Sequence, residues 1–280
     1  MRDRELTVAV AQFEPGLDVA RNLDTVEQMT RAAVARGAGL VVFPEFSTCF
    51  EPSLGERMGA AAEPLDGSIM TRLGQIAAAV GAHLVVGTAE LAGDGGDDPT
   101  AAAEASARFH NTVVALGPDG SLVACYRKLH LYDAFGQRES ERVAPGVIAA
   151  PEVFVVDGFT VGLQTCYDLR FPEVTRRLVD AGADVVLVPA EWVRGPHKLH
   201  HWRTLAAARA IENTVFLAAA DQTGKAGLGH SMILDPWGSE LAALGEDPGV
   251  VVAICSGAKL DEVRELNPAL RLRRFTVTPR

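Results

Sequence analysis

A cysteine, a glutamate and a lysine each stand at or just beyond the end of a predicted strand. Cys166 follows an apolar run and is followed by polar residues, Glu45 follows residues 40–43 and Pro44, and Lys128 follows residues 121–126. Acyl transfer at a thiol requires a nucleophile, a base to take its proton, and a donor or cation to hold the oxyanion. Open α/β sheets bind ligands at the C-terminal ends of their strands. We therefore expect these three side chains to form one site.

Their surroundings suggest how each would act. Glu45 has apolar neighbours on both sides, so its carboxylate would be partly desolvated, as a general base often is, although a solvated loop acid is the commoner role for one such residue. A cation fixed near a developing oxyanion can contribute several kcal/mol, about what one good oxyanion donor is worth. Lys128 is also expected to favour the thiolate form of Cys166.

The N-terminal half alternates strands and helices. Residues 6–13 and 40–43 read as buried strands around a helix at 18–36, for which Asp18 is a plausible N-cap. A helix at 68–80, closed by Gly81, precedes a strand at 82–88. Residues 111–116 and 121–126 flank the sequence Gly117-Pro118-Asp119-Gly120 and predict a hairpin. Residues 92–107 are rich in Gly, Asp and Ala and indicate a surface loop, to which we assign no chemistry.

The C-terminal half has a similar layout. We expect strands at 153–156 and at the run that ends in Cys166, a helix from Pro172 to Asp180, and a strand at 185–188. A helix at 199–213, a strand at 214–220, a hairpin of 229–234 with 240–244, a strand at 250–254 and a helix from about Asp261 follow. Residues 37–45 align without a gap with residues 182–190, which suggests two related βαβ layouts.

Composition narrows the class of protein. The chain has 280 residues, is 48% hydrophobic and carries a formal charge of −10, which favours one domain over residues 1–280 and argues against nucleic acid. No signal segment opens the chain and no run approaches the roughly 20 apolar residues of a membrane span, so we expect a cytoplasmic protein with no membrane partner. Its four cysteines show no CxxC pairing, which argues against a zinc site or a disulfide scaffold.

Several short motifs follow one another along nearly the whole chain: Phe43-Pro44-Glu45, Tyr126 to Asp133, Cys166 to Glu173, Ala208 to Asn213, Gly229 to Met232 and Asp235 to Gly238. In this order they resemble the motifs of the nitrilase superfamily of carbon–nitrogen hydrolases. The chain most resembles its Nit branch, which includes ω-amidases and deaminated-glutathione amidases. The resemblance implies a four-layer α-β-β-α sandwich of two mixed β-sheets. It also implies that Glu45 is the general base, Lys128 stabilises the tetrahedral intermediate, Cys166 is the nucleophile, and the backbone N–H of Tyr167 completes the oxyanion hole.

Further residues are weaker candidates. The family often has a second glutamate after the lysine, and Glu139 matches it, with a solvated-loop role as the alternative. Trp192 follows a stretch that lies beside the site in related enzymes, so it is expected to form an aromatic wall. Arg170 could hold a substrate carboxylate, or pair with Glu173 or Asp168.

Other side chains with possible chemistry are given structural roles. His197, His200 and His201 lack the glutamate of an HExxH metal motif and are expected to line the start of a helix. Cys49 might border the pocket, whereas Cys125 and Cys255 are expected in the core.

The resemblance predicts hydrolysis of a small linear amide to a carboxylate and ammonia through a thioester, without metal or organic cofactor. It also implies a homodimer or a larger homo-oligomer. Hydrolysis of a nitrile or an N-carbamoyl compound by the same three residues is the alternative enzyme. A catalytically silent scaffold is the alternative from another class, and a nucleic-acid module is suggested only by the basic tail at residues 271–274.

Overall fold

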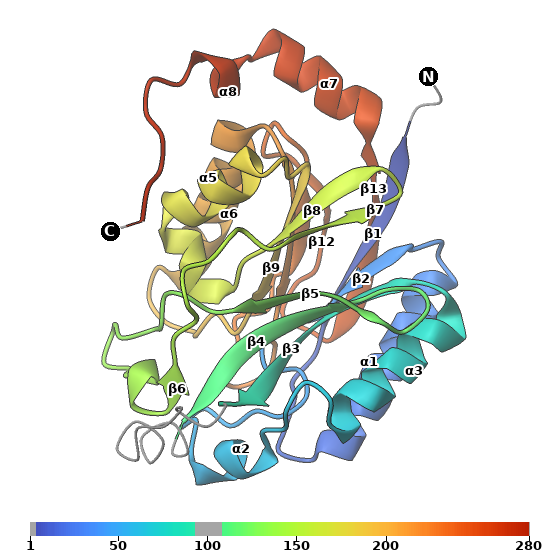
Figure 1. Ribbon diagram of the computed structural model, residues 1–280, viewed down its shortest axis with the longest axis vertical. Coiled ribbons are helices and arrows are strands. Elements are labelled where there is room, and N and C mark those ends of the chain that lie inside the picture. Colours follow the sequence, from blue (N-terminus) through green and yellow to red (C-terminus); the bar gives the residue numbers. More distant parts are fainter. Residues whose placement is uncertain (1–3, 93–107, 280) are drawn as a thin grey trace.

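Two mixed β-sheets pack face to face, and helices cover their outer faces (Figure 1). The computed structural model describes residues 4–92 and 108–279, so most of the loop predicted at 92–107 lies outside the described residues. In order across it, the first sheet contains β13 (Gly249–Ser256), β1 (Glu5–Gln12), β2 (Leu40–Val42), β3 (His83–Leu91), β4 (Phe109–Leu116) and β5 (Leu122–Arg127), with β6 (Val143–Ala144) beside β4. The second contains β12 (Glu240–Ala243), β11 (Met232–Leu234), β10 (Phe216–Asp221), β9 (Val185–Ala190), β8 (Phe159–Leu163) and β7 (Val153–Val156).

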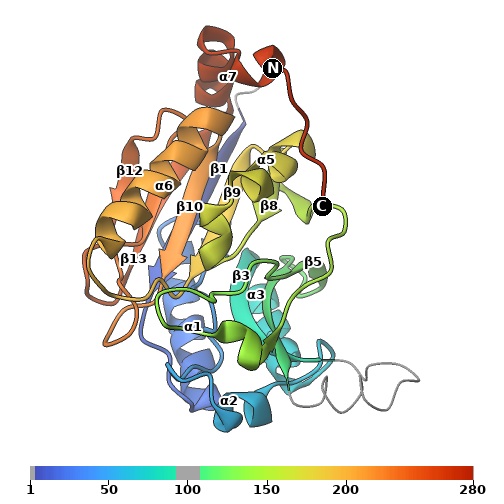
Figure 2. The same cartoon turned by 90° about the vertical axis from the view of Figure 1, so that its left-hand side faces the viewer.

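The helices complete four layers (Figure 2). α1 (Val19–Val34) and α3 (Ser68–Val80) pack on the first sheet, and α5 (Pro172–Asp180) and α6 (Lys198–Asn213) on the second. α2 (Glu56–Ala61) lies at one end, and α7 (Gly257–Leu266) leads to α8 (Ala269–Leu272), which contacts α6. The α-β-β-α sandwich expected from the family resemblance is therefore confirmed.

The largest apolar cluster lies between the sheets. Val8 and Leu40 of the first sheet share it with Phe159, Leu187 and Phe216 of the second, and each of these side chains is almost fully buried. β2 and β9 are buried along their whole length, which explains why they read as continuous apolar runs rather than alternating ones.

β2 and β9 occupy equivalent places. β2 pairs in parallel with β1 and β3, and β9 pairs in parallel with β8 and β10. The sequence similarity between residues 37–45 and 182–190 thus falls on corresponding strands of the two sheets. Glu45 and Glu191 both come just after these strands, so they lie at the same edge of the sandwich.

Local signals placed most element ends correctly. Asp18 caps α1 by accepting from the Arg21 N–H at 3.1 Å, and Gly81 ends α3 in the left-handed conformation. Among the boundaries that differ from expectation, two have a clear local cause. The strand before the cysteine ends at Leu163, because Cys166 already begins a 3-10 helix, η2 (Cys166–Arg170). The last long helix starts at Gly257 rather than near Asp261, because the Ser256 hydroxyl accepts from the Lys259 N–H and caps it there.

None of the helices in residues 4–92 and 108–279 combines the length and the apolar character that a membrane-spanning helix requires.

Candidate active site

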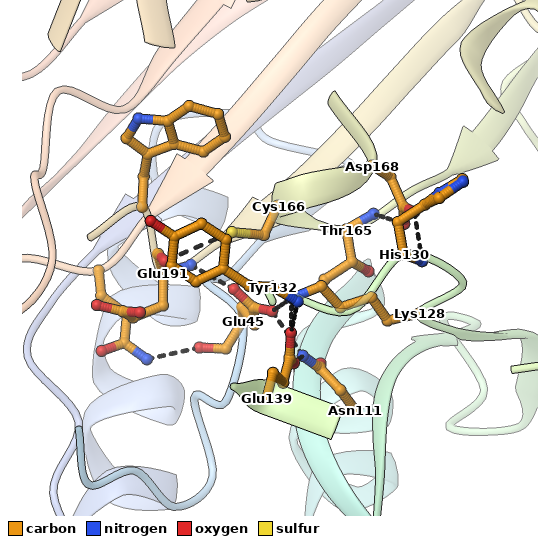
Figure 3. A network of polar contacts seen from close by, with 12 residues as sticks. Glu45, Asn111, Lys128, His130, Tyr132, Glu139, Thr165, Cys166, Asp168 and Glu191 are labelled. Carbon is orange, nitrogen blue, oxygen red and sulfur yellow. Dashed lines mark hydrogen bonds and ion pairs between the residues drawn. The ribbon is translucent and has the colours of Figure 1, made fainter. Parts of the chain in front are cut away.

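A buried lysine lies between two buried carboxylates at the edge where β2 and β5 end (Figure 3). Lys128 Nζ is 2.9 Å from Glu45 Oε1 and 2.8 Å from Glu139 Oε2. Glu139 belongs to the short 3-10 helix η1 (Glu139–Glu141), and its Oε2 also accepts from the Tyr132 N–H at 2.6 Å. Glu139 is therefore a member of the buried cluster rather than a solvated loop acid.

The backbone after β2 holds Glu45 in place. Glu45 Oε2 accepts from the backbone N–H of Glu191 at 2.6 Å, and the Gln222 side chain donates to the carbonyl of Glu45 at 2.8 Å. Both partners belong to the second sheet or the segments that follow its strands, so contacts between the sheets orient the glutamate. The next residue, Phe46, has φ of 54°, which turns the chain sharply away.

Cys166 sits in a tight turn directly after Thr165. Its φ is 43°, a left-handed conformation that a non-glycine residue adopts only when its surroundings enforce it. The thiol is buried and lies 3.4 Å from the carbonyl oxygen of Glu191, to which it can donate.

Asp168 ties the cysteine turn to the segment that carries Lys128. Its Oδ2 accepts from the Thr165 N–H at 3.1 Å and from the Tyr126 hydroxyl at 2.7 Å, and its Oδ1 accepts from the His130 N–H at 3.1 Å and lies 2.7 Å from His130 Nδ1. The fully buried carboxyl thus contacts residues on both sides of Lys128 and the residue before Cys166. The nucleophile and the cation are positioned together.

The thiol itself is not activated in the way the sequence suggested. Burial raises the pKa of Cys166 well above its ordinary value, the negative charge of Glu45 raises it further, and Lys128 opposes them only in part. Lys128 thus acts in the expected direction, favouring the thiolate, but burial and the charge of Glu45 outweigh it. Burial acts to lower the pKa of Lys128, but the charges of Glu139 and Glu45 hold it well above its usual range.

A further carboxyl faces the same cluster. The pKa of Glu191 is raised well above its ordinary value, first by burial and then by the charge of Glu45. Its Oε1 is buried and has no hydrogen-bond partner among the described residues. Burial and the neighbouring charge therefore favour the protonated, neutral form of this carboxyl.

A cavity of about 400 Å³ opens over these groups. Every residue proposed from the sequence lines it: Glu45, Lys128, Glu139, Cys166, Tyr167, Arg170 and Trp192. Arg170 lies over the Trp192 ring, 4.7 Å from its centroid, and its Nε is buried without a partner. No ion pair with Asp168 or Glu173 is found for it within the described residues, so that alternative is not supported.

A second cation shares these aromatic faces. Lys198 Nζ is 4.3 Å from the Phe135 ring centroid and 4.7 Å from that of Tyr132, whose hydroxyl accepts from it. Burial, followed by the charge of Arg170, lowers the pKa of Lys198, and burial raises the pKa of Tyr132 to about 12. Among the described residues no carboxylate forms an ion pair with Lys198 or Arg170. The cavity can therefore accept an anion.

Sequence reasoning missed four residues of this site: Asn111, Tyr132, Glu191 and Lys198. Asn111 donates to both carboxylates beside Lys128, and a polar pair within the apolar run of β4 was the signal available for it. Glu191 follows β9 as Glu45 follows β2, one position beyond Ala190, the residue that aligns with Glu45. Tyr132 lies within the motif from Tyr126 to Asp133, whereas Lys198 carried no such signal, because Tyr132 and Phe135 reach it from a distant segment.

Other expectations about cysteines and histidines can be compared directly. Cys49 does not border the cavity; it is buried beside Phe46, Phe50 and Met58, with its thiol 3.9 Å from the carbonyl of Leu17. Cys255 is a buried core residue, whereas Cys125 is only partly buried and burial raises its pKa to about 11. His197 precedes α6 as its N-cap, and residues 4–92 and 108–279 contain no His, Cys, Asp and Glu cluster suited to a metal ion.

The sequence and the fold of this chain are similar to those of known carbon–nitrogen hydrolases. A model of the carbon–nitrogen hydrolase family matches residues 7–265. The chain is 35% identical to a deaminated glutathione amidase of Rattus norvegicus over 95% of this chain and 82% of the relative. It superposes on the C. elegans NitFhit protein with a TM-score of 0.83 at 28% identity, covering 98% of this chain and 66% of the other.

An amidase from Nesterenkonia sp. is similar at 27% identity and a TM-score of 0.75, covering 97% of this chain and 98% of the other. In one variant of that amidase the active-site cysteine carries the product of Michael addition of acrylamide.

Proposed function

Since the chain belongs to the carbon–nitrogen hydrolase family, in the Nit-like branch of the nitrilase superfamily, we propose that Cys166, Glu45, Lys128 and Glu139 form its active site. The chain is an amidase that acts on carbon–nitrogen bonds outside peptides. The observation that carries the assignment is the buried Lys128 between two carboxylates, in a cavity that the buried Cys166 also lines.

The first half of the reaction acylates the cysteine. Cys166 Sγ attacks the amide carbonyl while Glu45 accepts the thiol proton, which gives a tetrahedral intermediate. Because burial raises the pKa of the thiol, we propose that Glu45 takes this proton as the sulfur attacks. Glu45 then gives the proton to the departing nitrogen. Ammonia is released, and the acyl group remains bound to Cys166 as a thioester.

The second half releases the acid. Water attacks the thioester carbonyl while Glu45 takes one of its protons, and the sulfur leaves as the thiol when that proton is returned. The net change is amide plus water to carboxylic acid plus ammonia, and the enzyme ends as it began.

Lys128 can stabilise the oxyanion because one N–H of its ammonium group is not used by the two glutamates. An ammonium group has three N–H bonds, and two of them meet Glu45 and Glu139. The third, together with the backbone N–H of Tyr167, is proposed to bind the oxyanion. Glu139 orients Lys128 for this role, and the two carboxylates keep the lysine charged.

Arg170 and Lys198, two cations that line the cavity, suggest the class of acyl group. Arg170 and Lys198 lie against shared aromatic rings without a carboxylate partner among the described residues, and desolvated cations of this kind bind carboxylates strongly. We propose that the substrate is a small linear amide whose acyl group ends in a carboxylate, with Trp192 as an aromatic wall. The rat relative is named for deaminated glutathione, which supports an anionic acyl group.

Two alternative functions, another carbon–nitrogen hydrolase activity and a silent scaffold, are less well supported. A nitrile or N-carbamoyl hydrolase would use the same three residues, but the named relatives are amidases. A silent scaffold would have no use for buried charges, whose desolvation costs several kcal/mol per ion unless they are closely paired.

We also propose that residues 1–280 form one domain, that the enzyme acts in the cytoplasm, and that it forms a homodimer or larger homo-oligomer. The family match over residues 7–265, four free thiols and exposed apolar side chains such as Val147 and Phe275 support these points.

A pair of matched substrates tests the proposed function. We expect ammonia release from glutaramate, which carries a carboxylate, and a much lower kcat/KM for pentanamide, which has the same chain length without it. Intact mass should show an acyl adduct on Cys166 during turnover. Cys166→Ala, which removes little volume, should release no ammonia while unfolding like the wild type.

Glu45→Gln should lose both acylation and deacylation, so it should show neither ammonia nor adduct. Full activity in Cys166→Ala would refute the mechanism, and equal rates for the two amides would refute only the anionic acyl group.

A further inference from the structure

We propose that Asn111 is a positioning residue for the amidase reaction: its side-chain amide joins Glu45 to Glu139 and determines which oxygen of Glu45 carries the proton. This inference rests on the proposed roles of Glu45 and Cys166. Asn111 does not line the cavity, so it acts through the two glutamates and not on the substrate.

The contacts of Asn111 form a closed ring with the cluster (Figure 3). Its Nδ2 donates to Glu45 Oε1 at 2.6 Å and to Glu139 Oε1 at 2.9 Å, while Lys128 donates to Glu45 Oε1 and to Glu139 Oε2. The backbone carbonyl of Asn111 also accepts from the Lys128 N–H at 2.9 Å. One fully buried residue of β4 therefore holds the lysine backbone and both carboxylates.

Charge explains why a neutral donor is needed there. One ammonium between two carboxylates leaves the cluster with a net charge of −1, and like charges at this separation in a dry site repel strongly. An amide NH₂ offers two donors without adding charge, and each one stabilises the ionised form of one carboxylate. A second cation would instead compete with Lys128.

The orientation of the amide supports this role. Asn111 Oδ1 is buried and has no hydrogen-bond partner among the described residues, which is costly for an amide oxygen. Turning the amide over would place that oxygen against two carboxylates, which is worse. In this orientation the amide leaves Oδ1 without a hydrogen bond, and Nδ2 donates to both Glu45 and Glu139.

The same contacts distinguish the two oxygens of Glu45. Oε1 accepts from both Lys128 and Asn111, which occupies its two lone pairs in the carboxylate plane. Oε2 accepts only from the Glu191 N–H among the described residues, so one lone pair remains free. We assign Oε2 as the atom that receives the Cys166 proton and returns it to the leaving nitrogen. Without Asn111, one lone pair of Oε1 becomes free, so the proton is no longer restricted to Oε2.

Asn111→Ala and Asn111→Asp test the inference. Alanine should lower kcat by about tenfold or more with less than about a threefold change in KM, since small misplacements of catalytic groups reduce rates on this scale. Aspartate should lower kcat by about a hundredfold or more, because it adds a third carboxylate. In both variants the acid limb of the pH–kcat/KM profile should move to higher pH, and further for aspartate, because the ionised carboxylates lose donors.

Asn213→Ala provides a matched control. Asn213 is also a fully buried asparagine with an unpaired Oδ1, and its Nδ2 donates to the Arg209 carbonyl at 2.9 Å, away from the cluster. Truncating it should affect stability without moving the acid limb. If an Asn111 variant fails to fold, Asn111→Ser, which keeps one donor, should fold and show a smaller shift in the same direction.

A second readout does not need turnover. The rate of Cys166 alkylation by iodoacetamide, followed by intact mass from pH 5 to 9, should show the same shift in the Asn111 variants and none in Asn213→Ala. Wild-type protein that releases no ammonia would refute the proposed function, and the alkylation profile would then decide the role of Asn111. A folded Asn111→Ala with wild-type kcat and unshifted profiles would overturn this inference.

Discussion

At the level of single residues, the proposed active site must stabilise several charged side chains that are removed from water. Lys128, Glu45 and Glu139 are each almost fully buried, and ions removed from water are tolerated only when they are paired and hydrogen-bonded. Asn111, the Glu191 N–H and the Tyr132 N–H supply the donors that Lys128 cannot. Glu191 has no such donors to its side chain, and burial raises its pKa and so favours its protonated form.

Glu191→Gln should therefore stabilise the protein in a pH-dependent way. The folded-state pKa of Glu191 is raised, so its stability contribution is complete below the unfolded pKa of about 4.3 and is lost as pH rises toward the folded value. Within that window the wild type loses about 1.4 kcal/mol per pH unit from this group. Glutamine cannot ionise, so its advantage in urea unfolding should be small near pH 4.5 and larger at pH 7.

The matched control for this prediction is Glu265→Gln, an exposed glutamate on α7. It should not reproduce the trend. A Glu191→Gln advantage that stays constant with pH would mean that Glu191 is ionised in the folded protein.

At the level of elements, tight turns after buried strands deliver the reactive groups. Cys166 and Phe46, the residue after Glu45, both have positive φ, which costs on the order of 1–3 kcal/mol for a non-glycine residue. Asp168 holds the first turn, and the Gln222 side chain holds the second through the Glu45 carbonyl. β3 packs directly beneath the second turn at Gly87.

Gly87→Ala should test how tightly that turn is held. A Cβ at Gly87 would lie 2.6 Å from Glu45 Cα and 2.7 Å from Phe46 N, so backbone atoms would have to move. We expect a loss of about 1–3 kcal/mol in the free energy of unfolding, typical of overpacking, and a lower kcat because Glu45 shifts. Urea unfolding and ammonia release measure the two effects.

Gly16→Ala is the comparison for Gly87→Ala, because no atom lies within 4 Å of the Cβ it would add. It should leave kcat unchanged. A Gly87→Ala variant with wild-type stability and kcat would show that the turn adapts without cost.

At the level of the whole molecule, each sheet supplies part of the site. Glu45, Asn111 and Lys128 come from the first sheet or its strand ends, and Cys166 and Glu191 follow strands of the second. Gln12 of β1 bridges the sheets by accepting from the Ser231 N–H at 2.9 Å and donating to the Gly245 carbonyl at 2.9 Å. Neither sheet can form the site alone.

We therefore expect the chain to unfold as one cooperative unit. Trp192 and Trp202 report on the second sheet, whereas activity also requires Glu45 from the first. Tryptophan emission, far-ultraviolet circular dichroism and loss of ammonia release should share one midpoint in urea at a single protein concentration. Distinct midpoints would contradict the proposed single domain.

The sequence alone determined the order of the long helices and most of the strands, the ends of many of them, and the residues that we propose for the chemistry. These features are local: an N-cap at Asp18, a left-handed Gly81, and polar residues placed where apolar strands end. Only the tertiary structure decided that Asn111 and Glu191 join the site, that Cys166 has a raised pKa, and that Lys198 lies beside Arg170. The reason is that burial and charge at each of these atoms come from the opposite sheet or from distant segments, and no short stretch of sequence contains both partners.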